Sequence, residues 1–122
     1  SAMNNLVVLY AMQGREDEHN YWERRVAKYR DANPYYHAWL GDRAAKDEDW
    51  KTAASFYEKA VALSPQESQL LSALAESHAQ LDEPEAALVY WQRAIEFATV
   101  QSERFGYQQQ LDAMQRERLA GT

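Results

Sequence analysis

Residues 34–67, PYYHAWLGDRAAKDEDWKTAASFYEKAVALSPQE, decide the fold, because the next stretch of equal length repeats their pattern. That stretch, residues 68–101, reads SQLLSALAESHAQLDEPEAALVYWQRAIEFATVQ. Aligned without a gap, the two stretches place large residues over large ones and small residues over small ones. The matched pairs are Leu40 with Leu74, Gly41 with Ala75, Ala53 with Ala87, Tyr57 with Trp91, and Ala60 with Ala94. Such a period predicts a protein built from helical repeats.

Apolar residues recur at intervals of three and four within each stretch, as in amphipathic helices. We expect helices at residues 3–13, 16–31, 34–46, 50–63, 67–80, 84–98 and 102–119. Ser64 is expected to cap the helix that follows it, with Pro65 in the first turn and Glu67 reaching back to the cap. Pro34 and Pro84 are expected to open helices by the same logic. The predicted fold class is therefore all-α.

The small residues that recur every 34 positions predict where the two helices of each hairpin cross. Gly41 and Ala75 are expected where the two helices of a hairpin approach closely, facing Ala53 and Ala87 respectively. A single hairpin cannot bury its apolar stripe alone. We therefore expect the hairpins to stack into a right-handed superhelix, an α-solenoid with one concave wall.

The last stretch, residues 102–119, carries Leu111, Met114 and Leu119 on one apolar stripe among polar residues. We expect this amphipathic helix to cap the exposed end of the stack. The alternative is a helix for dimerisation or for a membrane surface, which its mixed polar face favours less.

Composition limits the classes of partner. The 122 residues fit one domain. The formal net charge of -6 works against nucleic acid and against anionic membranes. No apolar run approaches the roughly 20 residues that cross a bilayer, so we expect a soluble chain.

The absence of Cys excludes disulfides and leaves the compartment open, with the cytoplasm favoured. Ser1-Ala2-Met3 is typical of a cleaved tag, and we expect a longer parent protein.

This pattern resembles the tetratricopeptide repeat over residues 4–101. The middle block matches the family signature at Leu40, Gly41, Trp50, Ala53, Tyr57, Ala60 and Pro65. The third block keeps Leu74, Ala75, Ala87, Trp91 and Ala94 but has Thr99 where a closing Pro is usual. The first block is degenerate, with His19 and Glu23 where a small and an aromatic residue are usual. The resemblance implies one domain with repeats at 1–33, 34–67 and 68–101 and a capping helix at 102–119.

The resemblance also implies a peptide-binding groove, lined by one stripe from the first helix of each hairpin. The residues on this stripe are Asn5, Val8, Met12, Tyr35, Trp39, Asp42, Lys46, Gln69, Ser72, Glu76 and Gln80. Trp39 is expected to anchor the ligand, since Trp often dominates interface energy, although it could instead pack on the neighbouring hairpin. Asp42 and Glu76 favour a neutral or basic protein or peptide partner.

A terminal carboxylate is disfavoured as the ligand of this groove. Family members that bind a C-terminal carboxylate use Lys, Arg and Asn at set groove positions. This chain has Asn4, Val8, Trp39, Ser72 and Glu76 there.

No residue pattern points to catalysis, a cofactor or a metal. His19, His37 and His78 are far apart in the sequence and are expected to pack within hairpins. The acidic residues at 16–18, 47–49 and 82–85 are expected to stabilise helix starts. Arg24, Arg25, Lys28 and Arg30 form a basic run that is either solvated or in contact with an acidic partner.

Three functions remain open at this point. The chain is expected to be a non-enzymatic scaffold that binds another protein. It could instead be an accessory arm that positions a catalytic domain outside these residues. Self-association through the first hairpin is the third alternative.

Overall fold

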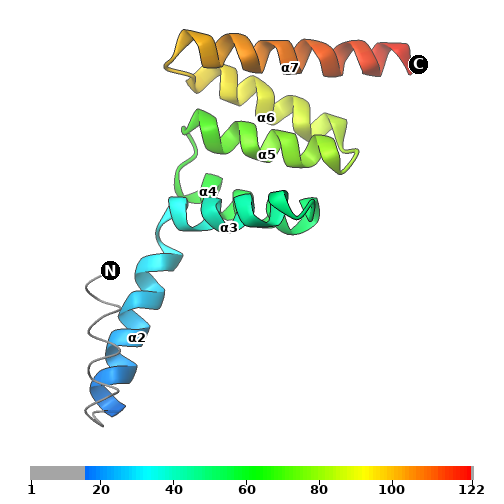
Figure 1. The fold of residues 1–122 in the computed structure, drawn as a ribbon. Helices are drawn as coiled ribbons and strands as arrows, with labels where there is room; N and C mark the ends of the chain where they lie inside the picture. Colours follow the sequence, from blue (N-terminus) through cyan, green and yellow to red (C-terminus); the bar gives the residue numbers. More distant parts are fainter. Residues whose placement is uncertain (1–15, 122) are drawn as a thin grey trace. The chain divides into compact units, whose positions relative to one another are not determined.

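The computed structural model describes residues 16–121, which form six α-helices and no strand (Figure 1). The chain divides into two compact units, residues 1–33 and residues 34–122, and each is described by itself. The predicted helix at 3–13 and the predicted groove residues Asn5, Val8 and Met12 lie outside the described residues. The expectation of one domain over the whole chain stays a prediction.

In the first unit, the described structure is helix α2 (Glu16–Asp31). Its first turn is acidic and its last turn is basic, an order that stabilises the helix dipole at both ends. Val26 is its buried residue. Its bounds are those that the sequence predicts.

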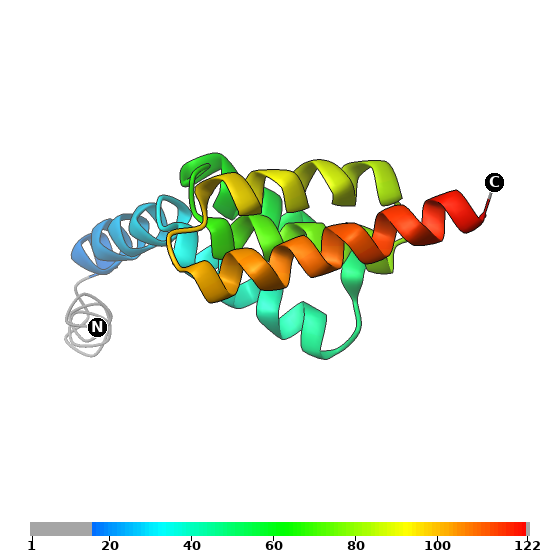
Figure 2. The same ribbon diagram turned by 90° about the horizontal axis from the view of Figure 1, so that it is seen from above.

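The second unit contains five helices, each packed on the one before it (Figure 1). They are α3 (Pro34–Lys46), α4 (Trp50–Leu63), α5 (Ser68–Gln80), α6 (Pro84–Phe97) and α7 (Gln101–Ala120). Successive helices run in opposite directions, and α7 runs back along α6 in both views (Figure 2). The helix bounds agree with the sequence prediction to within one residue at nearly every end.

The period of the sequence recurs in the backbone. Helices α3 and α5 begin and end 34 residues apart, and so do α4 and α6. The turns inside these two hairpins also match, because Glu48 and Asp82 both adopt a φ of 59°. The Asp49 N–H donates to Ala44 O, and the Glu83 N–H to His78 O, each at 2.9 Å. Both turns are therefore the same Schellman motif, with an acidic residue in the left-handed position.

The core follows the predicted columns of small residues. Ala53 and Ala60 of α4 pack with Leu70, Leu71 and Leu74 of α5 in one cluster, and all five are buried. A second cluster joins α5, α6 and α7. It contains Ala75, Ala87, Leu88, Trp91 and Leu111. Small residues therefore stand where helices meet, as the period predicts.

The predicted partner of Gly41 differs from the one in the structure. A Cβ built at Gly41 would lie 2.6 Å from Cε1 of Tyr57, and its three nearest atoms all belong to the Tyr57 ring. The small residue of α3 thus makes room for an aromatic ring of α4, whereas the sequence analysis placed it against Ala53. The period predicts that a small residue occupies this position, but it does not predict which side chain of the neighbouring helix packs against it.

The predicted cap at Ser64 is wrong. The Ser64 N–H donates to Ala60 O at 3.0 Å and closes α4, so this residue serves the preceding helix. Pro65 and Gln66 form a turn, and α5 begins only at Ser68. Glu67 makes no side-chain cap, because its carboxylate accepts a hydrogen bond from Tyr35. Pro84, in contrast, opens α6 as predicted.

Helix α7 covers the α5–α6 hairpin. Leu111 is buried in the second cluster, and Tyr107 and Met114 pack against it. The Arg118–Glu85 ion pair, at 2.6 Å, holds the end of α7 to the start of α6. Leu119 was predicted on the apolar stripe but is 76% exposed. None of the helices described at residues 16–121 is long and apolar enough to span a membrane.

Candidate functional site

On α3, the four predicted groove residues all have exposed side chains. Tyr35 is 60% exposed and Trp39 is 51% exposed, and Asp42 and Lys46 follow them along the helix. Steps of four, three and four residues keep these side chains on neighbouring turns of one side. Helix α3 therefore offers two large aromatic rings and two opposite charges to a ligand.

Trp39 has two ring contacts within α3. The guanidinium carbon of Arg43 lies 5.0 Å from the centre of the Trp39 ring, a cation–π arrangement within α3 itself. The Tyr36 ring lies 6.1 Å away, tilted by 33°. Arg43 and Tyr36 of the same helix thus lie beside the Trp39 ring, while about half of its surface stays open to solvent.

Asp42 is held in place by α4. The Tyr57 hydroxyl donates to Asp42 Oδ1 at 2.5 Å, and the Tyr57 ring is buried against Gly41. Burial, followed by the hydrogen bond and the charge of Asp42, raises the pKa of Tyr57. The phenol therefore stays protonated and keeps the carboxylate oriented. Tyr57 was expected only as a packing residue of the repeat, because its hydrogen bond to Asp42 depends on the pairing of α3 with α4.

On α5, the predicted groove residues are joined by short-range hydrogen bonds. The Ser72 hydroxyl donates to the Gln69 carbonyl at 2.9 Å, and Gln80 Nε2 donates to Glu76 Oε1 at 3.3 Å. Gln69 and Gln80 are exposed, whereas Ser72 and Glu76 are half-buried. This part of the candidate site offers amide and carboxylate groups but no aromatic ring.

Two long-range hydrogen bonds bring these helices together. The Tyr35 hydroxyl donates to Glu67 Oε1 at 2.9 Å, and this bond, with the charge of Glu67, raises the pKa of Tyr35. Gln69 Nε2 donates to Glu103 Oε1 of α7 at 3.3 Å. Tyr35, Gln69 and Glu103 stand 34 residues apart, so they occupy the same position in successive periods. The starts of α3, α5 and α7 therefore lie side by side.

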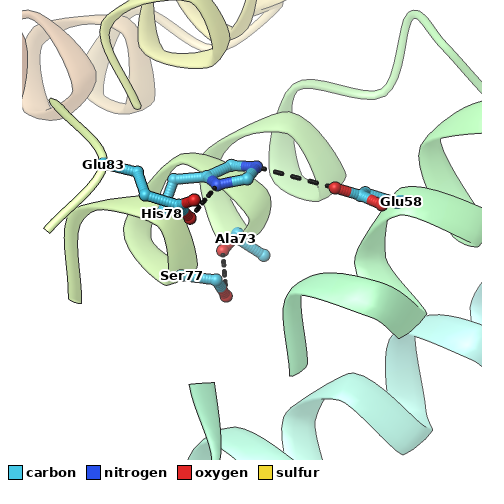
Figure 3. A network of polar contacts seen from close by, with 5 residues as sticks. All are labelled: Glu58, Ala73, Ser77, His78 and Glu83. Carbon is cyan, nitrogen blue, oxygen red and sulfur yellow. Dashed lines mark hydrogen bonds and ion pairs between the residues drawn. The ribbon is translucent and has the colours of Figure 1, made fainter. Parts of the chain in front are cut away.

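His78 forms a polar link between α4, α5 and α6 (Figure 3). Its Nδ1 lies 3.0 Å from Glu83 Oε1 and its Nε2 lies 3.8 Å from Glu58 Oε1. The Tyr90 ring stacks on the imidazole at 5.6 Å, with 5° between the planes. This arrangement fits the structural role that the sequence predicts for His78.

The other two histidines lie elsewhere. His37 is buried on α3, and His19 pairs with Glu23 within α2 at 3.5 Å. Within residues 16–121, no group of three or more His, Cys, Asp or Glu side chains could hold a metal ion.

No protein-family model matches the chain, and no curated protein matches its sequence. The assignment of a function therefore depends on the periodicity of the structure and on the groups that α3 and α5 expose. That these residues form a binding groove stays a prediction.

Proposed function

We propose that this chain is a non-catalytic, tetratricopeptide-type scaffold that binds a peptide segment or domain of another protein. In this proposal its hairpins stack into a right-handed superhelix, and the first helix of each hairpin lines the binding groove. The recurrence of helices and turns at 34 residues carries the proposal. A repeat of that length, made of two helices with a small residue at their crossing, is the unit of this family.

The chemistry of α3 suits a peptide ligand. Trp39 and Tyr35 supply large, rigid rings, which lose little conformational entropy when a ligand covers them. Asp42 is already oriented by Tyr57, so it can accept a backbone or side-chain N–H without reorganisation. Gln69 and Ser72 add hydrogen-bonding groups from the neighbouring helix. A rigid aromatic anchor beside fixed polar groups is the pattern of a peptide-binding surface.

The charge of the same face favours a neutral or basic segment. Four carboxylates lie on or next to the helices of this face. They belong to Asp42 of α3, Glu67 just before α5, Glu76 of α5 and Glu103 of α7. The cations of α3 near this face are Arg43, which lies over the Trp39 ring, and Lys46, and the four carboxylates outnumber them. A Lys or Arg of the ligand would therefore meet carboxylates, whereas an acidic ligand would be repelled.

The test uses peptides selected against the intact chain from a random library. Their dissociation constants, measured by fluorescence anisotropy, should rise about tenfold or more for Trp39→Ala, because the variant removes the anchor ring. The control is Phe105→Ala on α7, which removes an aromatic ring that is 64% exposed but lies outside the predicted groove. Circular dichroism of both variants checks that the helices persist.

Charge selectivity is a second readout of the same experiment. Basic peptides should lose more affinity than neutral ones for Glu76→Lys. The proposal is contradicted if the selected peptides bind Trp39→Ala as tightly as the parent chain. It is also contradicted if they lose as much affinity for Phe105→Ala as for Trp39→Ala.

A further inference from the structure

Helix α2 carries a second surface that the proposed groove does not use. Three cations lie between two tyrosines on one side of this helix, away from the buried Val26. We call this surface the α2 stripe; its residues are Tyr21, Arg24, Arg25, Lys28 and Tyr29. Tyr21 is 48% and Tyr29 is 63% exposed, and the three cations are exposed. Together with Ala27 and Asp31, these side chains line a shallow hollow in the surface.

Arg25 is already ordered at the centre of the α2 stripe. Its Nη1 donates to the Tyr21 hydroxyl at 2.9 Å, and its guanidinium carbon lies 5.6 Å from the ring centres of both Tyr21 and Trp22. A guanidinium has five N–H donors, and the phenol uses one. The others remain available to a carboxylate, which Arg binds best through two parallel hydrogen bonds.

Arg24 and Lys28 stand four residues apart, an arrangement in which like charges destabilise a helix. Neither has an ion-pair partner among residues 16–121. The helix dipole favours cations in the last turn, but Arg24 and Arg25 lie before that turn. Arg24, Arg25 and Lys28 therefore outnumber Asp31, the one carboxylate that lines the same hollow, and none of the three forms an ion pair within the described structure.

We propose that the α2 stripe binds a short acidic peptide segment of a partner protein. In this complex the carboxylates meet Arg24, Arg25 and Lys28, and Tyr21 and Tyr29 pack on the segment from either end. The stripe is about 12 Å long at 1.5 Å per helical residue, which accommodates three or four extended residues. This proposal is independent of the groove on α3 and α5, which favours the opposite charge.

Local charges favour a peptide over a nucleic acid at this site. Asp17 and Glu18 precede the stripe and Asp31 follows it, so a longer polyanion would run into carboxylates at both ends. Nucleic-acid binding needs phosphate neutralisation over many contacts, and the whole chain has a net charge of -6. A short acidic segment needs only the three cations.

The test is a titration of the isotope-labelled full chain with a blocked tetraglutamate peptide, followed by nuclear magnetic resonance. Amide shifts should concentrate in residues 20–30, and blocked tetraglutamine should cause none. Arg24→Glu with Lys28→Glu should weaken the binding at least about tenfold, since two exposed ion pairs are replaced by repulsion. Arg24→Gln with Lys28→Gln should weaken it less, and this variant serves if charge reversal unfolds α2.

The matched control is Lys51→Glu with Lys59→Glu on α4, which changes the net charge equally at another surface. Equal weakening in the control would show general electrostatic attraction and would overturn the proposal. Absence of shifts at millimolar peptide would also overturn it. If octathymidylate bound more tightly than tetraglutamate, the α2 stripe would be a nucleic-acid site and the proposal would be wrong. A concentration-dependent mass that Arg24→Glu with Lys28→Glu abolishes would reassign it to a second copy of the chain.

Discussion

Gly41 and Gly106 both lie inside helices of the second unit, but their surroundings differ. A Cβ at Gly41 would lie within 3 Å of the Tyr57 ring, whereas a Cβ at Gly106 would meet nothing within 4 Å. The Tyr57 ring is buried, so it has little room to move aside. The same substitution should therefore have opposite effects at the two glycines.

We expect Gly41→Ala to lower the free energy of unfolding by about 1–2 kcal/mol, because overpacking exceeds the gain in helix propensity. Gly106→Ala should raise it by about 0.5–1 kcal/mol. Urea denaturation followed by circular dichroism measures both. A stabilised Gly41→Ala variant would contradict the close contact between α3 and α4.

Tyr57 gives a prediction for alkaline pH. Its pKa is raised above the usual 10.0 in the folded state, so the neutral phenol stabilises the fold below that pH. This stabilisation is lost as the pH rises above 10, because the unfolded chain then releases a proton that the folded chain retains. The urea midpoint of the parent chain should fall more steeply above pH 10 than that of Tyr57→Phe.

The control for this pH series is Tyr29→Phe, which removes a hydroxyl from a ring that is 63% exposed on α2. Its midpoint should follow that of the parent chain. Parallel midpoints for the parent chain and Tyr57→Phe would contradict the burial of Tyr57 and its hydrogen bond to Asp42.

At the scale of the helices, the two Schellman turns carry a conformational cost. Glu48 and Asp82 both hold a φ of 59°, a region that Gly adopts freely and that most other residues avoid. Asp tolerates this region better than Glu does. The cost should therefore be larger at Glu48.

We expect Glu48→Gly to raise the free energy of unfolding by about 1 kcal/mol, measured by urea denaturation. Asp47→Gly, one residue earlier in the same turn, should give no gain, because Asp47 has no positive φ. If Glu48→Gly gives no gain in the free energy of unfolding over Asp47→Gly, the backbone at residue 48 is not left-handed.

The helices could be predicted from sequence because their signals are local. Intervals of three and four residues and the prolines at 34 and 84 fix the helix bounds closely. Ser64 misled the prediction, because a Ser before Pro can serve either the helix that ends or the helix that begins. In the structure its backbone N–H donates to Ala60 O and ends α4.

Contacts between helices were harder to predict than the helices themselves. Tyr57 and Asp42 are 15 residues apart, and Tyr35 and Glu67 are 32 apart. No periodic pattern pairs them, because each bond depends on the rotation of two helices about their axes. The exposed side of α3 was predictable, but the contacts that orient Asp42 and Tyr35 were not.

For the whole molecule, the two clusters of the second unit form one continuous core because they share neighbours. Tyr90 of α6 and Tyr107 of α7 pack against both clusters, so the core continues from α4 to α7. Ala38, Ala44 and Ala45 of α3 pack against the cluster that contains Leu70, Leu71 and Leu74 of α5, so α3 and α5 share one core, as a shared binding face requires. The α2 stripe belongs to the other unit, and the acidic ligand that we propose for it has the opposite charge to the ligand that we propose for α3 and α5.

The central claim is that the exposed sides of α3 and α5 bind a single peptide segment. It is tested most directly by mapping a library-selected peptide on the isotope-labelled chain by nuclear magnetic resonance. We predict shifts at the Trp39 indole and at amides of both α3 and α5, with little change in α4 and α6. Shifts confined to α4 and α6, or an unchanged Trp39 indole at saturating peptide, would contradict the claim.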